Sequence, residues 1–394
     1  TTDEKQTFTM NFGPQHPATH GTLHLILELD GERVVHCAPQ LGYLHTGFEK
    51  LGEHRSLNQF VALSDRLNYM SPLANNVGLV YAAEQMLDVE PTPRCVAIRV
   101  VLAELSRIAD HIVCCGLAGM DLGAFSVMLW SFEERERLYD IFEAVTGTRL
   151  TTSYTRVGGL ARDVHDGFIP QVREMLVRIP QLVKEVEFML GRNRIFTDRT
   201  HGVGVLTREQ CEAYGVTGPV ARAAGLEYDV RRAFPYYGYD QLDWEVVVST
   251  DADCYARFQV RLAEILESCK IIRQVIDAFP DGPVNVDDPK IVLPPKEDVY
   301  TKMESLIHHF KLIMEGHGLK LPRGKEFYAA TETSNGELGY FLSGDGSMHP
   351  LRIRVRAPSF YNYQPLNEMV CGNTLSDILA VLSTLNVIAG ELDR

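Results

Sequence analysis

The 394-residue sequence predicts an α+β protein whose core is mainly helical. From Phe48 to about Phe279, apolar residues recur at helical intervals in long segments. Before and after this region, short apolar runs lie between tight-turn dipeptides, a pattern typical of strands. We therefore expect a small N-terminal β region (1–47), a central helical bundle with a loop-rich insert (48–290) and a C-terminal α/β part (291–394).

The N-terminal region has three predicted strands. They are Phe8–Phe12, Thr22–Asp30 and Glu32–Cys37, and Asp30-Gly31 supplies a tight-turn signal between the last two. The first two strands are joined through the stretch Asn11–His24, NFGPQHPATHGTLH. This stretch is rich in proline and glycine, so we expect an ordered loop rather than a regular helix.

That loop carries His16, His20 and His24 within nine residues. Two interpretations stay open at this point. The histidines either bond backbone carbonyls in a structural loop, or one of them titrates or donates hydrogen bonds at a site. A metal site is the weaker functional option, because no cysteine or carboxylate lies at ligand spacing nearby.

The central region contains the long helices. The segment Pro93–Cys115 is apolar around much of its circumference, which indicates burial inside a bundle. The loop-rich insert Asn193–Trp244 contains an aromatic cluster from Phe234 to Tyr239. We favour a protein interface for this cluster over nucleic-acid stacking, because the formal net charge is −14. Helical periodicity predicts helices over 48–63, 75–87, 93–115, 124–146, 167–190 and 251–279.

The last third of the chain changes character. A helix over 298–315 is followed by a hairpin, 327–333 and 337–342, around Asn335-Gly336. A strand is expected over 351–357 and an apolar helix over 374–392.

Composition excludes several classes of protein. The acidic balance argues against nucleic acid as a partner. No apolar run approaches the length of a bilayer span, and the first ten residues lack the features of a signal peptide. The eight cysteines form no C-x-x-C, and most lie in apolar helical patterns, which predicts buried, reduced thiols in a cytosolic compartment.

Nucleotide-binding and hydrolase fingerprints are absent. The run from Gly116 to Gly119 follows a predicted helix rather than a strand, and no G-x-S-x-G motif occurs. By pattern alone, Asp121 fits a helix cap and Tyr69 a half-buried core tyrosine. The remaining candidates are isolated polar residues near predicted helix ends: His20, Glu49, Arg55, Arg66, Tyr69 and Asp121.

Several long motifs carry a resemblance to a known family. They are NFGPQHPATHGTLHLILELDGE, LGYLHTGFEK, EHRSLNQ, SDRLNYMSPLANN and DLGAFSVMLWSFEERE, and the chain ends in GELDR. In the same order, they resemble the D subunit of respiratory complex I, the proton-translocating NADH–quinone oxidoreductase. The resemblance runs from about Phe8 to Arg394.

That family is itself similar to the large subunit of nickel–iron hydrogenases, so the resemblance implies a hydrogenase large-subunit-like fold. In hydrogenases two C-x-x-C pairs hold the metal centre. The matching positions here are Asn68 and Ser71 in the first pair, and Ile388 and Glu391 in the second. A four-thiolate metal site cannot be built from these residues, so we expect no metal held by this chain.

In the complex I family the corresponding cavity receives a quinone headgroup. The resemblance implies that His20 and Tyr69 hydrogen-bond the two carbonyl ends of the quinone, and that Asp121 pairs with His20. A quinone that takes two electrons also needs two protons, which a tyrosine and a histidine–carboxylate pair can supply. The resemblance implies, as a hypothesis for the whole family, that the resulting charge change triggers the coupling to proton pumping.

The resemblance also implies partners and a location. The terminal iron–sulfur cluster should belong to a partner subunit, because this chain lacks cluster-binding cysteine spacing. We expect that subunit, other peripheral-arm subunits and the nearby membrane arm as partners, and no nucleic acid. The place would be peripheral, on the cytoplasmic side of a bacterial plasma membrane or the matrix side of an equivalent inner membrane.

Three positions depart from many relatives: Asn68 and Asn386 replace Asp, and Thr151 replaces a histidine beside the cluster. We therefore expect the reduction potential of the cluster to respond weakly to pH. Two alternatives remain. One is a hydrogenase-type or ferredoxin-linked relative with a metal centre, which the missing thiolates disfavour. The other is a scaffold without a catalytic role.

Overall fold

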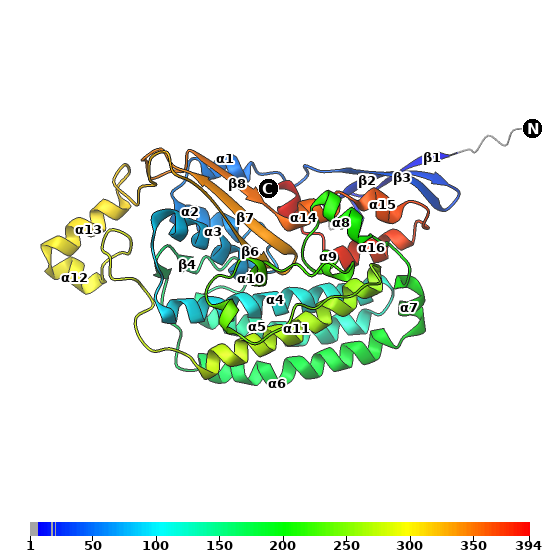
Figure 1. Ribbon diagram of the computed structural model, residues 1–394, viewed down its shortest axis with the longest axis horizontal. Coiled ribbons are helices and arrows are strands. Elements are labelled where there is room, and N and C mark those ends of the chain that lie inside the picture. The colour runs from blue at the N-terminus through cyan, green and yellow to red at the C-terminus, as the bar shows by residue number, and fades with distance from the viewer. Residues whose placement is uncertain (1–6, 17–18, 20) are drawn as a thin grey trace, which may run out of the picture.

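The computed structural model describes residues 7–16, 19 and 21–394. Figure 1 shows a layer of long helices along one side of the molecule, with the strands and shorter helices above it. The chain is thus a mixed helix and strand protein, as predicted, and His20 lies outside the described residues.

Four helices form the bundle: α4 (Pro93–Asp121), α5 (Phe125–Thr146), α6 (Phe168–Val186) and α11 (Cys254–Asp277). Helix α4 packs against both α5 and α11, and α6 closes the group against the same two helices. Thr92 caps α4 by accepting the backbone N–H of Cys95, and Pro93 follows at the first helical position. Side chains around the whole circumference of α4 are buried, as its apolar sequence predicts.

The N-terminal sheet is antiparallel, in the order β1 (Phe8–Phe12), β2 (His24–Asp30) and β3 (Arg33–Gln40). Alternate residues of β2, from Leu25 to Leu29, are buried on one face because side chains of a strand alternate in direction. They share a hydrophobic core with α15 (Leu366–Val370) and α16 (Asp377–Leu385), so the first and last parts of the chain pack together.

The second sheet has the order β6 (Glu326–Thr333), β7 (Gly336–Ser343) and β8 (Arg352–Arg356). Helix α3 (Pro72–Leu87) covers β6 and β7. Gly336 has φ +130°, and a Cβ there would meet Oγ1 of Thr217 at 2.6 Å, so the hairpin turn requires glycine. The neighbouring Ser334 hydrogen-bonds Asp110 of α4, so this turn reaches the helical bundle.

Three helices predicted as continuous are broken. The segment 48–63 forms α1 (Phe48–Gly52) and α2 (Leu57–Ser64), because Ser56 starts the second helix with a capping box. The segment 298–315 forms α12 (Lys296–Thr301) and α13 (Met303–Ile313). The segment 374–392 forms α16 and α17 (Ala389–Asp393), separated at Asn386, which has φ +55°. Apolar periodicity continues across such caps and does not reveal them.

Helix α4 extends past its predicted end. It continues through Gly116 and Gly119 to Asp121 rather than stopping at Cys115. A Cβ on Gly119 would lie 3.0 Å from Cδ1 of Leu190, and one on Gly116 would lie 3.2 Å from Cβ of Ser131. Both glycines therefore allow close packing of neighbouring elements instead of ending the helix.

The aromatic cluster of the insert is mostly core. Tyr236, Tyr239 and Trp244 are buried together, whereas Phe234 is 68% exposed. The predicted protein interface is therefore wrong for most of this cluster, because aromatic content does not distinguish a core from a surface. The remaining elements are β4 (Thr155–Arg156), β5 (Gly159–Leu160), η2 (Glu187–Gly191), α7 (Arg194–Thr200), α8 (Arg208–Tyr214), α9 (Pro219–Ala223), α10 (Val230–Ala233), η3 (Tyr239–Gln241) and α14 (Pro358–Tyr363).

All eight cysteines are free thiols, and seven are buried, with Cys371 partly exposed. Burial raises the pKa of the Cys114 and Cys211 thiols to about 11, so both stay protonated near neutral pH. Within the part of the chain that is described, no helix combines the length and apolar character needed to cross a membrane.

Candidate functional site

Tyr69 lies on the short connection between α2 and α3. Asp65, at the start of this connection, is buried and accepts hydrogen bonds from Nδ2 of Asn76 at 2.7 Å and from the backbone N–H of Ser153 at 2.9 Å. Burial raises the pKa of the Asp65 carboxyl, and these donors act in the opposite direction. The connection is thus anchored to α3 and to the segment before β4.

Asn68 fixes the other end of the connection. Its Oδ1 accepts the backbone N–H groups of Met70 at 3.0 Å and Ser71 at 3.2 Å. Its Nδ2 donates to Oδ2 of Asp110 on α4 at 3.2 Å and to Oγ of Ser334 at 3.3 Å. One fully buried amide therefore holds the Tyr69 connection against both the helical bundle and the β6–β7 turn.

Asp110 is the centre of a buried polar cluster. Its Oδ1 accepts a hydrogen bond from Nδ2 of Asn386 at 2.9 Å, and its Oδ2 accepts from Asn68 and from the hydroxyl of Ser334. Asn386 also donates to Oδ1 of Asn335 at 2.8 Å. We call this group the Asp110 cluster; its members are Asn68, Asp110, Ser334, Asn335, Asn386 and Glu391.

Glu391, the second carboxyl of the cluster, is fully buried. Its Oε2 accepts the backbone N–H of Ser359 at 3.0 Å and the Ser359 hydroxyl, while its Oε1 has no hydrogen-bond partner among the described residues. Burial, with the nearby Asp110, raises the pKa of Glu391 to about 7, although Ser359 and Asn68 act to lower it. Near neutral pH this carboxyl is therefore a mixture of protonated and ionised forms, whereas an ordinary glutamate is fully ionised.

Tyr69 is half-buried and lies near the carboxyl groups of the Asp110 cluster. Burial raises the pKa of its hydroxyl, and the nearby carboxyl groups of Asp110 and Glu391 raise it further. The phenol is therefore neutral at physiological pH and can donate both a hydrogen bond and a proton.

Asp121 is the last residue of α4 and is half-buried. Its side chain makes no capping bond and no hydrogen bond to any residue in the described part of the chain, so the helix-cap interpretation is wrong. Burial raises the pKa of the Asp121 carboxyl to about 6. Eleven residues separate Asp121 from Asp110, about 16 Å along the helix axis, and no described contact joins Asp121 to Tyr69.

Two of the three loop histidines lie in the described residues. His24 is engaged in local packing: its Nε2 lies 3.2 Å from Oδ1 of Asn11, and its Nδ1 lies 3.2 Å from the hydroxyl of Tyr43. The ring of His16 packs against Phe12, with centroids 4.3 Å apart. A structural role therefore accounts for His24, and the expected role of His20 falls outside what the structure describes.

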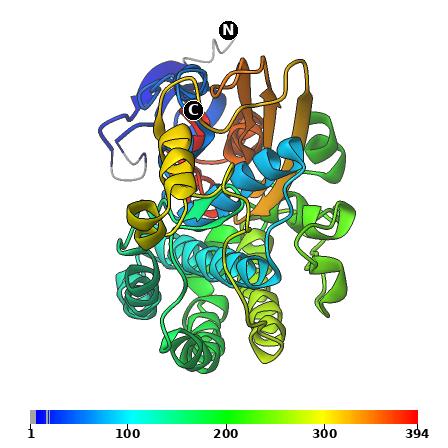
Figure 2. The same ribbon diagram turned by 90° about the vertical axis from the view of Figure 1, so that its left-hand side faces the viewer.

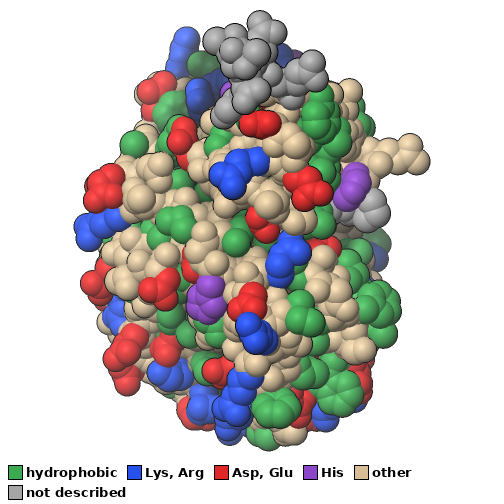
Figure 3. Space-filling model, turned by 90° about the vertical axis from the view of Figure 1, so that its right-hand side faces the viewer, with side chains coloured by type: hydrophobic (Ala, Val, Ile, Leu, Met, Phe, Trp, Pro, Cys, Tyr) green, Lys and Arg blue, Asp and Glu red, His purple; other side chains and the backbone are tan. Residues whose placement is uncertain are grey.

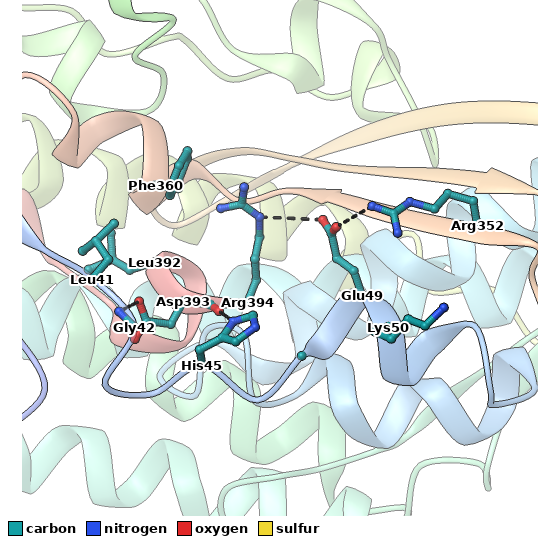
Figure 4. Close-up of a pocket in the computed structure, with 11 residues that line it drawn as sticks. Leu41, Gly42, His45, Glu49, Lys50, Arg352, Phe360, Leu392, Asp393 and Arg394 are labelled. Carbon is teal, nitrogen blue, oxygen red and sulfur yellow. Dashed lines mark hydrogen bonds and ion pairs between the residues drawn. The ribbon is translucent and has the colours of Figure 1, made fainter.

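Glu49 organises the C-terminus rather than a separate site. It accepts the backbone N–H of Val355 at 2.9 Å and pairs with Arg352 and Arg394 (Figure 4). In the same region Asp393 accepts the backbone N–H groups of Gly42 at 2.8 Å and Leu44 at 2.7 Å. The side chains of Glu49, Asp393 and Arg394 line a cavity of about 460 Å³. Their contacts dock the terminal GELDR against the loop that follows β3.

Arg55 and Arg66 lie on an exposed face of α2 and its ends. With Gln59, Ala62 and Leu63 they line a shallow hollow of about 470 Å³. Thr151 is also exposed, and its neighbour Thr152 hydrogen-bonds Asp65, which in turn lies beside Arg66. Arg55 and Arg66 thus form a basic surface next to the Tyr69 connection, and the contact of Thr152 with Asp65 brings the segment that contains Thr151 to the same connection.

The positions that the resemblance matches to hydrogenase thiolates lie in or beside the Asp110 cluster, except for Ile388. The amide of Asn68 lies close enough to Glu391 to lower the pKa of that carboxyl, and Ser71 bonds Ser334 of the same cluster at 3.1 Å. Ile388 is buried and offers no ligand atom. This donor set of amide, hydroxyl and carboxyl oxygens suits hydrogen bonding and proton transfer, not a soft metal centre.

Sequence reasoning missed Asp110 and Ser334 as members of the site. A signal for Asp110 was present, since Asp110-His111 interrupts a helix that is otherwise apolar on most faces. A charged residue in such a helix needs a buried partner. Ser334 belongs to the hairpin turn, and only the tertiary structure brings that turn to α4.

A comparison with protein families gives the class to which this chain belongs. Residues 121–394 match the family described as "Respiratory-chain NADH dehydrogenase, 49 Kd subunit". The match covers more than half of the chain, so the chain belongs to this family of oxidoreductase subunits.

Relatives extend the similarity over nearly the whole chain. It is 46% identical over 386 residues to the NADH-quinone oxidoreductase D subunit of Geotalea uraniireducens, with 98% of each chain covered. The corresponding D subunit of Leptospira biflexa is 47% identical, with 98% of this chain and 94% of the relative covered. One of the D subunits of Sorangium cellulosum is 48% identical, with 98% and 95% covered. The predicted resemblance is thereby confirmed.

Proposed function

We propose that this chain is the quinone-site subunit of the peripheral arm of a respiratory complex I. With an iron–sulfur partner subunit it forms the pocket in which a quinone headgroup is reduced. The names of the relatives support the substrate. The observation that carries the proposal is the environment of Tyr69. This neutral, half-buried phenol lies near two buried carboxyl groups, and hydrogen bonds of Asn68 fix the connection on which it sits.

The chemistry follows from the donors. Reduction of a quinone places negative charge on two oxygen atoms, and preorganised donors stabilise that charge as it develops. Tyr69 donates a hydrogen bond and a proton at one oxygen, and His20 does so at the other. Asp121 suits the role of partner to His20, because it is a half-buried carboxyl without a hydrogen bond to any described residue.

Departure of the proton from His20 leaves Asp121 charged and unpaired, and this change of charge is the event that we propose to couple to proton translocation. Burial raises the pKa of Asp121 to about 6, so this carboxyl takes up a proton more readily than an ordinary aspartate does. Loss of either proton donor should cost about 1–3 kcal/mol of transition-state stabilisation when a buried group is left unpaired.

The finer architecture is part of the same proposal. We infer a hydrogenase large-subunit-like layout divided at 1–47, 48–290 and 291–394. Support comes from Asn68 and Glu391, which match thiolate positions of the two separate hydrogenase motifs and lie in one buried cluster. The quinone thus occupies the region where hydrogenases hold a metal centre.

Partners and location follow from the family. We propose that the hollow lined by Arg55 and Arg66 faces the subunit that holds the terminal iron–sulfur cluster, with membrane-arm subunits nearby. Such a basic surface fits a partner that carries an anionic, thiolate-bound cluster. The chain would be peripheral, on the cytoplasmic side of the bacterial membrane or the matrix side of an equivalent one.

The test compares two electron-transfer rates in membranes that carry Tyr69→Phe. One rate is from NADH to a quinone, and the other is from NADH to an artificial acceptor that takes electrons upstream. We expect the quinone rate alone to fall, roughly 5- to 150-fold for the 1–3 kcal/mol above. Tyr255→Phe is the matched control, because Tyr255 is also half-buried and its hydroxyl donates to a backbone carbonyl at 3.2 Å, far from α2.

Equal quinone rates in the Tyr69→Phe and Tyr255→Phe membranes would reject the site and leave the scaffold alternative. Asp121→Asn tests the second half of the site by the same assay. If Asp121 pairs with His20, the variant loses quinone rate and the pH dependence of the remaining rate changes; an unchanged pH profile contradicts the pairing.

A further inference from the structure

Helices α12 and α13 extend from one end of the molecule. Figure 1 shows this pair standing off from the bundle and from the β6–β8 sheet, and in Figure 2, viewed from that end, the pair lies in front of the other elements. Neither helix contains a buried residue. The two helices therefore contribute little to the core of this chain, and their side chains are available to something else.

Several of the exposed side chains of this pair are large and apolar. Tyr300 is 80% exposed, Met303 77% and Phe310 53%. Single exposed apolar residues are ordinary, but a contiguous group of this size on two short helices marks an interaction surface. We call this group the α13 face; its members are Tyr300, Met303, Leu306, Ile307, Phe310, Ile313 and Met314.

A cationic cavity of about 480 Å³ adjoins the α13 face. It lies between α13 and the loops at 288–291 and 317–320, and its floor is apolar. The one carboxylate in its lining, Asp288, accepts the backbone N–H of Lys290 at 2.8 Å and so serves the local turn. The basic residues that line the cavity are Lys290, His308, Lys311, His317 and Lys320.

The lysines of this cavity are unpaired within the described part of the chain. The ion pairs that lysines form there, such as Lys302 with Asp298 and Lys325 with Asp88, do not include Lys290, Lys311 or Lys320. The cavity therefore carries three ammonium groups that no described ion pair neutralises, in a chain with a net charge of −14. On the opposite end of the molecule (Figure 3), acidic and basic side chains are interspersed.

The surface continues towards the proposed cluster-facing side. A second hollow, of about 250 Å³, lies between α13 and α2 and is lined by Leu57, Gln59, Leu312 and Ile313. Gln59 also lines the hollow that contains Arg66. The α13 face, the cationic cavity and the exposed side of α2 thus form one connected surface.

We propose that the α13 face and its cationic cavity bind another protein subunit, which presents an acidic segment flanked by apolar side chains. The apolar side chains would cover Phe310 and Met303, and one or more carboxylates would enter the cavity and pair with Lys311 and Lys320. Charge complementarity decides in favour of this partner, because the cavity holds a surplus of cations and little else that is polar. The proposal does not depend on quinone reduction at Tyr69.

Zero-length cross-linking of the intact complex tests the charge pairing. A carbodiimide joins an ammonium group to a carboxylate only where the two are in contact, and mass spectrometry then identifies the residues. We expect Lys290, Lys311 or Lys320 to be joined to Asp or Glu of a different subunit. Cross-links confined to carboxylates of this same chain overturn the proposal.

Hydroxyl-radical footprinting of the intact complex tests the apolar contact. We expect Tyr300 and Phe310 to be modified severalfold more slowly in the wild-type complex than in a complex that carries Lys311→Glu. Lys184→Glu is the matched control, because Lys184 is also exposed on a helix and lies on α6, away from this surface. Rapid modification of Phe310 in the wild type overturns the proposal even if Lys311→Glu fails to assemble.

A lipid occupant would give a different result. In that case Phe310 is protected in membranes, the protection is lost when detergent replaces lipid, and no cross-link to another subunit forms. That combination contradicts a protein partner.

Discussion

Nδ2 of Asn68 lies 3.2 Å from Oδ2 of Asp110, and both side chains are fully buried. The contact joins the connection that carries Tyr69 to the middle of the longest helix of the bundle. A carboxylate at position 68 would stand beside a second carboxylate and force the two to share a proton. The amide instead donates to Asp110, so both oxygens of the Asp110 side chain accept hydrogen bonds.

The Asn68→Ala variant should be less stable by about 1–3 kcal/mol, because Asp110 loses a donor and two backbone N–H groups lose an acceptor. Thermal inactivation of the purified complex measures this loss. Asn58→Ala is the control, since exposed Asn58 accepts one backbone N–H at 3.3 Å. Equal inactivation temperatures for the two variants would show that the Asn68 bonds do not stabilise the site.

The Glu391→Gln variant should change how stability depends on pH. In the folded chain the pKa of Glu391 is raised to about 7 by burial, above its ordinary value. The unfolded chain therefore loses this proton first, and wild-type stability falls as pH rises from about 4.5 to 7. Glutamine does not titrate, so the variant escapes this loss, which is roughly 3 kcal/mol at most.

Denaturation midpoints at pH 5 and pH 8 measure the effect. The difference between Glu391→Gln and the wild type should grow in favour of the variant at the higher pH. If the variant and the wild type differ by the same amount at pH 5 and at pH 8, Glu391 is already ionised in the folded chain at pH 5, and its raised pKa is contradicted.

The Arg99→Met variant should lose about 3–5 kcal/mol, because it leaves the buried Glu84 without its cation. Arg99 forms a two-point pair with Glu84, at 2.7 and 2.8 Å, and joins α3 to α4. Adding Glu84→Gln to this variant removes the stranded charge, so the double variant should regain part of the loss. Chemical denaturation of the three chains checks the order; a double variant less stable than Arg99→Met would contradict it.

The Thr151→His variant tests the neighbouring cluster. Thr151 is exposed on the proposed cluster-facing surface and cannot titrate, so the potential of the partner's cluster should respond weakly to pH. Histidine at this position should introduce a pH dependence between about pH 6 and 8. Redox titration of the complex at several pH values measures both. A strong pH dependence in the wild type would contradict the role assigned to position 151.

Sequence reasoning located the strands and the long helices with little error. Apolar periodicity marks α4 and α11 because each buries side chains at helical spacing, and Asn335-Gly336 marks the β6–β7 turn because glycine is required there. The same reasoning missed the breaks at Ser56 and Asn386. A cap or a left-handed residue interrupts the backbone without interrupting the apolar pattern.

The residues of the candidate site were likewise predicted only in part from the sequence. The roles of Tyr69 and Asp121 came from the family resemblance, and the structure describes both residues but joins them through no contact. Asp110, Ser334 and Ser359 come from three distant segments, and no local motif predicts that they meet. His20 rests on the resemblance alone.

The sequence by itself determined the mixed fold class, the helical core, the family and the loss of the thiolates, because each depends on residue type and short-range spacing. Only the tertiary structure decided which carboxyl groups share a buried site and that the pKa of Glu391 is raised there. A pKa depends on burial and on the groups within a few ångströms. Those neighbours, Asp110 for Glu391 and both carboxyl groups for Tyr69, come together only when α4, the β6–β7 turn and the C-terminus pack.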